Sequence, residues 1–325
     1  MDFGRVALAG GFLESEQFEN EQKYPLRLFF CDDCCAVQVV DKVSADVLFQ
    51  DYFYFSSSIG TLREHFRNYA AEVTSRFLSP PSASVLEFGC NDGVLLQPLA
   101  DEGIGTVIGV DPASNVLSSV DDQRLTLIND FFNESVADSV VERYGEMDMV
   151  LANNVYAHIP DIQGATQAVA RVLKKDGVFI FEDPYLGEVI EKTSFDQIYD
   201  EHAHIFSVLA LAGMLEECGL KIVEIENLKT HGGSNRIYAK KATNRSIEIS
   251  QNVEENIQKE QRGGLNKLST YLQFSERVVE SKSHLVSLLG KYKNVGKKII
   301  SYGATYKSST IFNYCGINTI VITYD

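Results

Sequence analysis

The residues best suited to hold a ligand lie at a glycine-bearing turn near position 90. Glu87, Gly89 and Gly93 form the pattern Glu-x-Gly-x-x-x-Gly, which ends one apolar stretch and opens an amphipathic one. Glycines let the backbone turn sharply and approach a ligand without a Cβ in the way. Open α/β sheets bind their ligands at such turns. A dinucleotide-binding loop would read Gly-x-Gly-x-x-Gly, so the spacing favours S-adenosylmethionine over NAD, with an ordinary strand-to-helix turn as the alternative.

Acidic residues follow the next two apolar stretches. Asp111 can accept hydrogen bonds from both hydroxyl groups of a ribose, and Asp130 with Phe131 can supply an acid and an apolar wall for an adenine ring. Because the carboxyl ends of parallel strands meet at one edge of a sheet, these side chains would join the glycine-bearing turn. They make the ordinary-turn alternative less probable. The other residues that we assign to the cofactor are Asn91, Asn153 and Tyr54.

The composition is that of a globular chain. Its 325 residues are enough for two domains, or for one domain with appendages. A formal net charge of −16 argues against a general nucleic-acid or anionic-membrane surface, because phosphates attract Lys and Arg. A few local donors could still bind a phosphorylated small molecule. The sequence shows no targeting segment and no apolar run of membrane-spanning length, so we expect a soluble cytoplasmic protein.

Short apolar strands alternate with amphipathic helices from residue 84 onward. This alternation predicts an α/β protein with a parallel sheet and helices on both faces, in the class I (Rossmann-like) arrangement. The predicted strands are 85–88, 106–110, 125–128, 147–152 and 177–182, followed by an antiparallel pair at 221–226 and 234–240. The predicted helices are 61–77, 93–100, 165–173 and 207–218.

The two ends of the chain predict smaller elements. The first sixty residues read as irregular apart from a strand at 24–30. A polar linker is expected at 241–264, and a long amphipathic helix at 268–288. A strand at 298–304, a short helix and a last strand at 319–323 complete the prediction.

Over nearly its whole length the sequence resembles the bacterial nucleotide-sugar C-methyltransferases. The most specific element of the resemblance is Tyr199-x-Glu201-His202. The other matching stretches are 24–26, Cys31-x-x-Cys34 with 37–38, 53–57, 87–93, 153–161, 182–185, 195–202, 231–236 and 302–307.

The resemblance implies methylation of carbon 3 of a nucleotide-linked 4-keto-deoxyhexose. A carbon next to a ketone reacts only after it loses a proton, so a base and a group that stabilises the enolate oxygen are needed. The resemblance places Tyr199, Glu201, His202 and His158 at the active site. His202 is the candidate base because imidazole can take a proton near neutral pH. Glu201 could orient it, Tyr199 could hydrogen-bond to the sugar oxygen, and His158 would face the methyl donor or the sugar.

Four further residues are assigned to the substrate. His231 and Arg236 could hold phosphate or sugar groups, together with Ser234, and Lys307 could approach the nucleotide diphosphate. Simpler readings stay open. Gly232-Gly233 after His231 could be only a hairpin turn, and Gly303 before Lys307 only a turn after a strand. Without the family context, His202 beside Glu201 is more often a surface hydrogen-bonded pair, and His158 could be a structural histidine.

The resemblance also implies a zinc site that this sequence supplies only in part. Cys31 and Cys34 have ligand spacing, but family members carry a second Cys-x-x-Cys pair upstream of a segment like Asp2-Phe3-Gly4. Zinc takes four ligands in structural sites, so we expect zinc to be possible but its site incomplete. We expect three segments: a truncated zinc-binding-like module at 1–60, a cofactor-binding methyltransferase domain at 61–240, and a helical linker with an incomplete Rossmann-like substrate-binding domain at 241–325.

Two other functions stay open from the sequence. The acceptor could be an oxygen or a nitrogen rather than a carbon, in which case His202 would deprotonate a hydroxyl group. The chain could also be a relic that holds the cofactor without turnover. If the protein is a sugar C-methyltransferase, its partner is a nucleotide-linked sugar, and we expect it to bind neither nucleic acid nor a membrane. We expect the protein to be a monomer.

Overall fold

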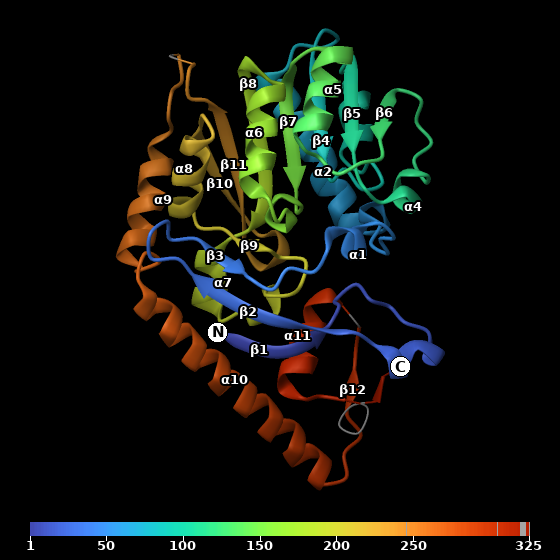
Figure 1. Ribbon diagram of the computed structural model, residues 1–325, viewed down its shortest axis with the longest axis vertical. Helices are drawn as coiled ribbons and strands as arrows, with labels where there is room; N and C mark the ends of the chain where they lie inside the picture. The colour runs from blue at the N-terminus through green and yellow to red at the C-terminus, as the bar shows by residue number, and fades with distance from the viewer. Residues whose placement is uncertain (245, 304, 319–322, 325) are drawn as a thin grey trace. The chain divides into compact units, whose positions relative to one another are not determined.

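The computed structural model describes residues 1–244, 246–303, 305–318 and 323–324 (Figure 1). The chain forms two compact units, each built from segments that are distant in sequence. Unit 1 contains Met1–Val43, Pro184–Ser207 and Lys259–Asp325, and unit 2 contains Ser44–Asp183 and Val208–Gln258. The sequence predicts three consecutive segments instead, and that division stays a prediction.

Unit 2 is organised around a seven-stranded sheet with the order β10-β11-β8-β7-β4-β5-β6. Neighbouring strands from β8 to β6 run parallel, and β10 and β11 form an antiparallel pair. The strands are β4 (Ser84–Phe88), β5 (Thr106–Val110), β6 (Leu125–Ile128), β7 (Met147–Asn153), β8 (Leu173–Pro184), β10 (Leu220–Leu228) and β11 (Ser234–Lys241). The seven strands that the sequence predicts in this region are therefore confirmed.

Helices cover the sheet of unit 2, and α5 and α6 pack side by side on one of its faces (Figure 1). Asn133 and Asp161 begin these two helices because their side chains accept hydrogen bonds from Val136 N and Gly164 N. The helices are α1 (Ala45–Phe49), α2 (Gly60–Phe77), α3 (Leu96–Asp101), α4 (Ser114–Leu117), α5 (Glu134–Tyr144), α6 (Ile162–Val172) and α8 (Val208–Glu217).

Unit 1 has its own sheet and its own core. The order β1-β2-β3-β9 joins β1 (Asp2–Ala7), β2 (Lys23–Phe30), β3 (Val37–Val39) and β9 (His204–Ile205) in antiparallel pairs. Buried side chains of this sheet, of the 184–207 segment and of α10 form one apolar cluster. The helices are α7 (Leu186–Lys192), α10 (Leu268–Asn294) and α11 (Tyr306–Cys315), and β12 (Ile300–Ser301) pairs in parallel with β13 (Thr323–Tyr324).

Helix α11 forms hydrogen bonds with two other segments of unit 1, the first strand and the segment 195–202. Ser309 Oγ donates to Ala7 O at 3.1 Å, and Ala7 N donates to Asn313 Oδ1 at 3.4 Å. On another side Thr310 Oγ1, which is buried, donates to Ile198 O at 2.7 Å. This helix therefore fixes both the first strand and the 195–202 segment.

Three predictions at the chain ends are wrong in part. The first sixty residues contain β1 and β3 as well as the expected strand. The polar linker contains a helix, α9 (Gln251–Arg262), which buries Val253 and is tied by Asn252 Nδ2 to Ile225 O at 2.7 Å. The strand expected at 298–304 is reduced to Ile300–Ser301.

The last predicted strand, 319–323, lies outside the described residues except for Thr323. Among the helices of the described chain, none is both long and apolar enough to span a bilayer.

Candidate active site

The glycine-bearing turn links β4 to α3 in unit 2. Gly89 and Gly93 have φ angles of 64° and 73°, and Asn91 has a φ of 50°, so the turn uses the left-handed region three times. That region favours glycine. A Cβ on Gly89 would also collide with the side chain of Val155. The two glycines are therefore required by the turn itself, and they leave its backbone bare for a ligand.

Glu87 and Asn153 place two unsatisfied acceptors next to this turn. Asn153 Nδ2 donates to Glu87 Oε1 at 2.9 Å, and both side chains are buried. Glu87 Oε2 and Asn153 Oδ1 have no hydrogen-bond partner among the described residues. Burial raises the pKa of Glu87 to about 8 without a ligand, whereas a positive charge beside it would favour the ionised, accepting form. Buried acceptors without partners are costly, so this pair is suited to receive the donors of a bound ligand, such as an ammonium group.

Asp111 lies at the end of β5, as predicted, but it also serves the protein. Its Oδ2 accepts from Asn91 N at 2.8 Å and its Oδ1 accepts from Ala113 N at 2.9 Å. Burial raises the pKa of this carboxyl. Each carboxylate oxygen can accept two hydrogen bonds, so Asp111 retains capacity for ribose hydroxyls while it shapes the turn.

The end of β6 offers an apolar edge. Asp130 is exposed, and its Oδ1 accepts from Phe131 N at 2.7 Å. Phe132 is the aromatic residue used by the core, since its ring stacks on that of Phe88 with centroids 4.5 Å apart. Phe131 is half-buried at the surface, where a flat ring system could lie against it.

The side chain of Asn91 is held by the chain itself. Its Nδ2 donates to Tyr54 O and its Oδ1 accepts from Ser56 N, both at 2.9 Å. Next to it, the buried Asp92 accepts from Ser57 N at 3.0 Å. The segment that carries Tyr54 is thus bound directly to the turn.

His158 lies on the turn after β7. Its ring is parallel to that of Phe49, with centroids 5.8 Å apart. Burial, with a smaller contribution from His231, lowers the pKa of His158 to about 4. The imidazole is therefore uncharged at neutral pH, so it can form hydrogen bonds but does not provide a positive charge.

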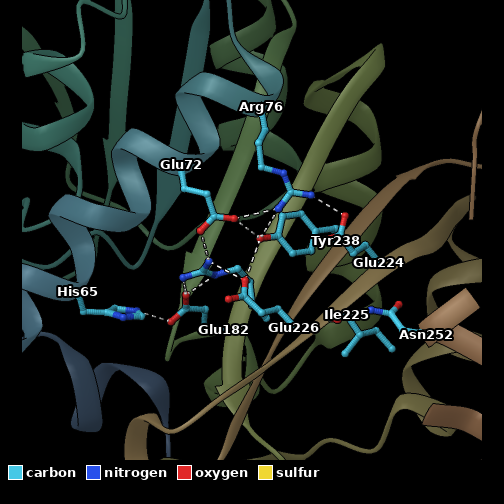
Figure 2. A network of polar contacts seen from close by, with 10 residues as sticks. His65, Glu72, Arg76, Glu182, Glu224, Ile225, Glu226, Tyr238 and Asn252 are labelled. Atoms are coloured by element: carbon cyan, nitrogen blue, oxygen red, sulfur yellow. Dashed lines mark hydrogen bonds and ion pairs between the residues drawn. The ribbon is translucent and has the colours of Figure 1, made fainter. Parts of the chain in front are cut away.

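Arg236 lies in a partly buried ionic network with Glu72, Glu182 and Glu226. Figure 2 shows these three glutamates together with His65 and Tyr238. Its Nη2 and Nε are 2.5 and 2.6 Å from Glu182 Oε1, and its Nη1 contacts Glu226 and Glu72 at 2.9 and 3.1 Å. His65 Nε2 is 2.9 Å from Glu182 Oε2. Three carboxylates therefore already contact the Arg236 guanidinium. The contact of Arg236 with substrate, which the sequence suggests, stays a prediction.

The hairpin between β10 and β11 holds the other two residues assigned to the substrate in unit 2. His231 has a φ of 51° and is half-buried. Ser234 is buried, and its Oγ donates to Thr230 O at 3.1 Å. Ser234 thus serves the turn that presents His231, and their contacts with substrate stay predictions.

In unit 1, His202 is held by the backbone of its own loop. Its Nδ1 is 2.6 Å from Gln197 O, its ring centroid is 4.1 Å from that of Tyr199, and its side chain is only 5% exposed. A carbonyl oxygen can only accept, so Nδ1 carries the proton. In the neutral ring, Nε2 then keeps the lone pair that a general base needs.

Glu201 lies in a tightly packed part of the same loop. A Cβ on Gly10 would lie 2.9 Å from Tyr306 Cε1 and 3.3 Å from Glu201 Oε1. Ala9 N donates to Asp200 Oδ1 at 3.0 Å, which fixes this part of the chain. Gly10 therefore allows the N-terminal segment to lie against Glu201 and the first residue of α11.

Lys307 follows Tyr306 in α11. It is half-buried, and burial lowers the pKa of its ammonium group, an effect that Asp196 opposes. The structure thus brings Lys307 into the same unit as the Tyr199-x-Glu201-His202 loop.

Cys31 and Cys34 lie in a tight turn of unit 1. Cys31 N donates to Ala36 O and Cys35 N donates to Cys31 O, both at 2.9 Å. Backbone N–H groups of Cys34 and Asp33 lower the pKa of Cys31, whereas burial raises that of Cys34. Across the described residues, no group of three or more histidine, cysteine or acidic side chains is placed to hold a metal ion. Two cysteines do not supply the four ligands of a structural zinc site.

Comparisons with known proteins identify the family. Residues 62–225 match a family described as a methyltransferase domain, and residues 229–325 match the C-methyltransferase C-terminal domain. Residues 1–49 match a family described as "Putative zinc binding domain". The chain is 30% identical over 318 residues to the C-methyltransferase NovU of Streptomyces niveus, a match that covers 98% of this chain and 75% of that protein. The chain belongs to the C-methyltransferase family.

This assignment confirms that the protein is a methyltransferase with the predicted class I fold. A shorter match joins this C-methyltransferase to the ubiquinone biosynthesis O-methyltransferase of Escherichia coli K12, with 30% identity over 99 residues, 30% of this chain and 41% of that protein.

Two solved structures show a weaker likeness. The magnesium protoporphyrin IX methyltransferase of Synechocystis PCC 6803 with bound SAH has a TM-score of 0.43 and 17% identity, over 55% of this chain and 82% of its own. The glycopeptide N-methyltransferase MtfA complexed with S-adenosyl-L-methionine has a TM-score of 0.43 and 13% identity, over 61% and 99%.

The structure adds residues that the sequence did not single out. Asp92 and Asn115 hold the segment before α2, and Gly10 lies close to both Tyr306 and Glu201. Asp92 lies within the recognised loop, so its buried position could have been suspected. Tyr306 lies in the matching stretch 302–307, but no role was assigned to it. The roles of Gly10 and Asn115 could not be predicted, because their partners are distant along the chain.

Proposed function

We propose that this protein transfers a methyl group from S-adenosylmethionine to carbon 3 of a nucleotide-linked 4-keto-deoxyhexose. The observation that carries the proposal is the ring of His202, which is fixed through Nδ1 in a chain of the C-methyltransferase family. A carbon acceptor needs a base near neutrality, and an imidazole whose Nδ1 carries the proton can use its Nε2 lone pair in that role.

The turn between β4 and α3 supports the choice of methyl donor. Glu87 Oε2 and Asn153 Oδ1 would accept from the ammonium group, Asp111 from the ribose, and Phe131 would cover the adenine. When bound, S-adenosylmethionine supplies an activated methyl group on a sulfonium sulfur. With the methyl already activated, positioning is the main requirement for transfer.

The residues of the Tyr199-x-Glu201-His202 loop would carry out the proton chemistry. His202 Nε2 takes the proton from carbon 3, and the positive charge on the ring is stabilised by the Gln197 carbonyl that accepts from Nδ1. Glu201 orients or polarises the imidazole. Tyr199 donates to the sugar oxygen on which negative charge develops.

The remaining residues would bind the substrate. Lys307, His231, Ser234 and Arg236 are assigned to sugar and phosphate groups, and His158 to the methyl donor or the sugar. His158 would act as a neutral hydrogen-bonding group, because burial lowers the pKa of His158 to about 4. The monomeric state and the cytoplasmic location stay predictions.

Hydrogen exchange at carbon 3 tests the reaction. The enzyme is incubated in deuterated water, without a methyl donor, with a panel of nucleotide-linked 4-keto-6-deoxyhexoses. Deuterium should appear at carbon 3 of at least one sugar with the wild type and not with His202→Ala. Methylation of a hydroxyl group without any such exchange would instead indicate an oxygen acceptor.

A further inference from the structure

Residues 52–57 run without strand pairing from Tyr52 to Phe55 and then enter a 3-10 helix (Ser56–Ser58), and both ends of this segment are tied to other parts of unit 2. At one end Tyr52 N donates to Asn115 Oδ1 at 3.2 Å, and Asn115 Nδ2 donates to Tyr52 O at 2.8 Å. Asn115 belongs to α4 and lies four residues after Asp111. We call this segment the 52–57 strap.

The other end of the strap is tied to the β4–α3 turn. Asn91 exchanges two hydrogen bonds with the backbone of Tyr54 and Ser56, both at 2.9 Å. Both carboxylate oxygens of Asp92 accept from Ser57 N, at 3.0 and 3.3 Å. The anchors therefore lie on the two turns that are assigned to the amino-acid and ribose parts of the cofactor.

The chemistry of the anchors explains why the strap stays in place without being a strand. A carboxamide offers one acceptor and one donor in the geometry of a peptide group. Asn115 and Asn91 can therefore each bind the strap backbone as a neighbouring strand would. The ring of Phe49, just before the strap, is stacked on His158 and adds a contact beyond β7.

We propose that the 52–57 strap closes over bound cofactor and that Asn115 is the positioning residue that holds it there. The inference rests on the proposed binding of S-adenosylmethionine at the β4–α3 turn. Asn115 is exposed and reaches only the strap backbone in these two hydrogen bonds, so it acts on the cofactor through the strap. Without it, this end of the strap loses two hydrogen bonds, and release of the cofactor becomes faster.

The chain offers a clean optical reporter, because it contains no tryptophan. Phe53 lies in the middle of the strap and is 59% exposed. Phe53→Trp therefore places a single tryptophan on the strap, which can be excited selectively at a wavelength where tyrosine absorbs little. In this full-length background we would compare Asn115→Ala, Asn115→Asp and the control Asn256→Ala. Asn256 makes its hydrogen bond to Asn252 O within α9.

Three measurements are needed for each protein. Calorimetry gives the Kd for S-adenosylhomocysteine, fluorescence in a displacement experiment gives its dissociation rate, and hydrogen exchange reports on the amides of residues 52–57. Circular dichroism establishes that each variant is folded. Asn115→Asp keeps the volume and the acceptor for Tyr52 N but loses the donor, so it separates the hydrogen bond from packing.

We expect Asn115→Ala, which loses two exposed hydrogen bonds, to raise the Kd and the dissociation rate by about fivefold to tenfold. Asn115→Asp, which loses only the bond donated to Tyr52 O, should raise both by a smaller factor. Amide exchange in the strap should accelerate in the same variants, and Asn256→Ala should match the parent. Two results in the Asn115 variants would overturn this inference without affecting the proposed function. One is faster amide exchange in the strap with an unchanged Kd, and the other is unchanged amide exchange in the strap. If the parent protein does not bind S-adenosylhomocysteine at all, the proposed function falls together with it.

Discussion

The Nδ1 atom of His202 lies 2.6 Å from the carbonyl oxygen of Gln197, five residues earlier in the same loop. This contact fixes the tautomer as well as the orientation of the ring, because the carbonyl can only accept. The Gln197 carbonyl thus leaves Nε2 as the basic nitrogen of the neutral ring. In the proposed function Glu201, in the same loop, orients or polarises that ring.

Replacement of His202 should separate chemistry from cofactor binding. We expect His202→Ala to lower the rate of methyl transfer by about 10²–10⁴-fold, the usual contribution of a general base. The Kd for S-adenosylhomocysteine should stay within a factor of two or so, since His202 is not assigned to the cofactor. The control is His284→Ala on α10, an exposed position that should leave both quantities unchanged. Loss of binding in His202→Ala would show a structural role instead.

A methyl group at Gly10 should disturb Glu201. The added Cβ of Gly10→Ala would lie 2.9 Å from Tyr306 Cε1 and 3.3 Å from Glu201 Oε1, so these side chains must move. We expect kcat to fall by about tenfold to a hundredfold, as small displacements at reacting groups do. The matched control is Gly290→Ala, where nothing lies within 4 Å of the new atom. An unchanged kcat in Gly10→Ala would mean that the position of Glu201 is not critical.

Glu87 should make stability depend on pH. Burial raises the pKa of Glu87 to about 8 in the folded protein, above that of the unfolded chain. The protonated carboxyl therefore stabilises the fold at low pH, and this contribution is lost as pH rises through about 8. Glu87→Gln cannot ionise. Its free energy of unfolding, relative to that of the wild type, should therefore rise by on the order of 2–3 kcal/mol between pH 6 and pH 9. Urea unfolding of both proteins at pH 6 and at pH 9 measures this change. The same difference in stability between variant and wild type at the two pH values would contradict the prediction.

Arg236 should be important for stability. Its guanidinium is buried against Glu182, and removing one partner of a buried pair leaves an uncompensated charge. We expect Arg236→Met to lower the free energy of unfolding by about 3–5 kcal/mol. Arg171→Met, which breaks an exposed pair with Asp138, should change it by less than about 1 kcal/mol. Wild-type stability in Arg236→Met, with a raised KM, would favour the substrate role predicted from the sequence.

The parts of this protein that follow from local patterns could be predicted from its sequence. Strands β5 and β6 were predicted to the residue, because short apolar runs between turns define them. The β4–α3 turn was recognisable because its glycines adopt left-handed φ angles that few other residues tolerate.

Features made by distant partners could not be predicted. Helix α9 reads as a polar linker because it buries few side chains, and its position depends on contacts such as that of Asn252 with Ile225. The engagement of Arg236 by Glu182, 54 residues earlier, is likewise invisible along the chain. The exposed amide of Asn115 has no pattern that would reveal its hold on Tyr52.

The hydrogen bonds between α11 and β1 have a consequence for biosynthesis. Ser309 and Ala7 are 302 positions apart, and ribosomes add about 5–20 residues per second. The first strand must therefore wait on the order of tens of seconds for its partner helix. During that time Phe3 and Val6, which end up buried, have no completed core to enter. Unit 2 ends at Gln258 and can form earlier, so nascent chains should depend on chaperones mainly through the N-terminal strands of unit 1.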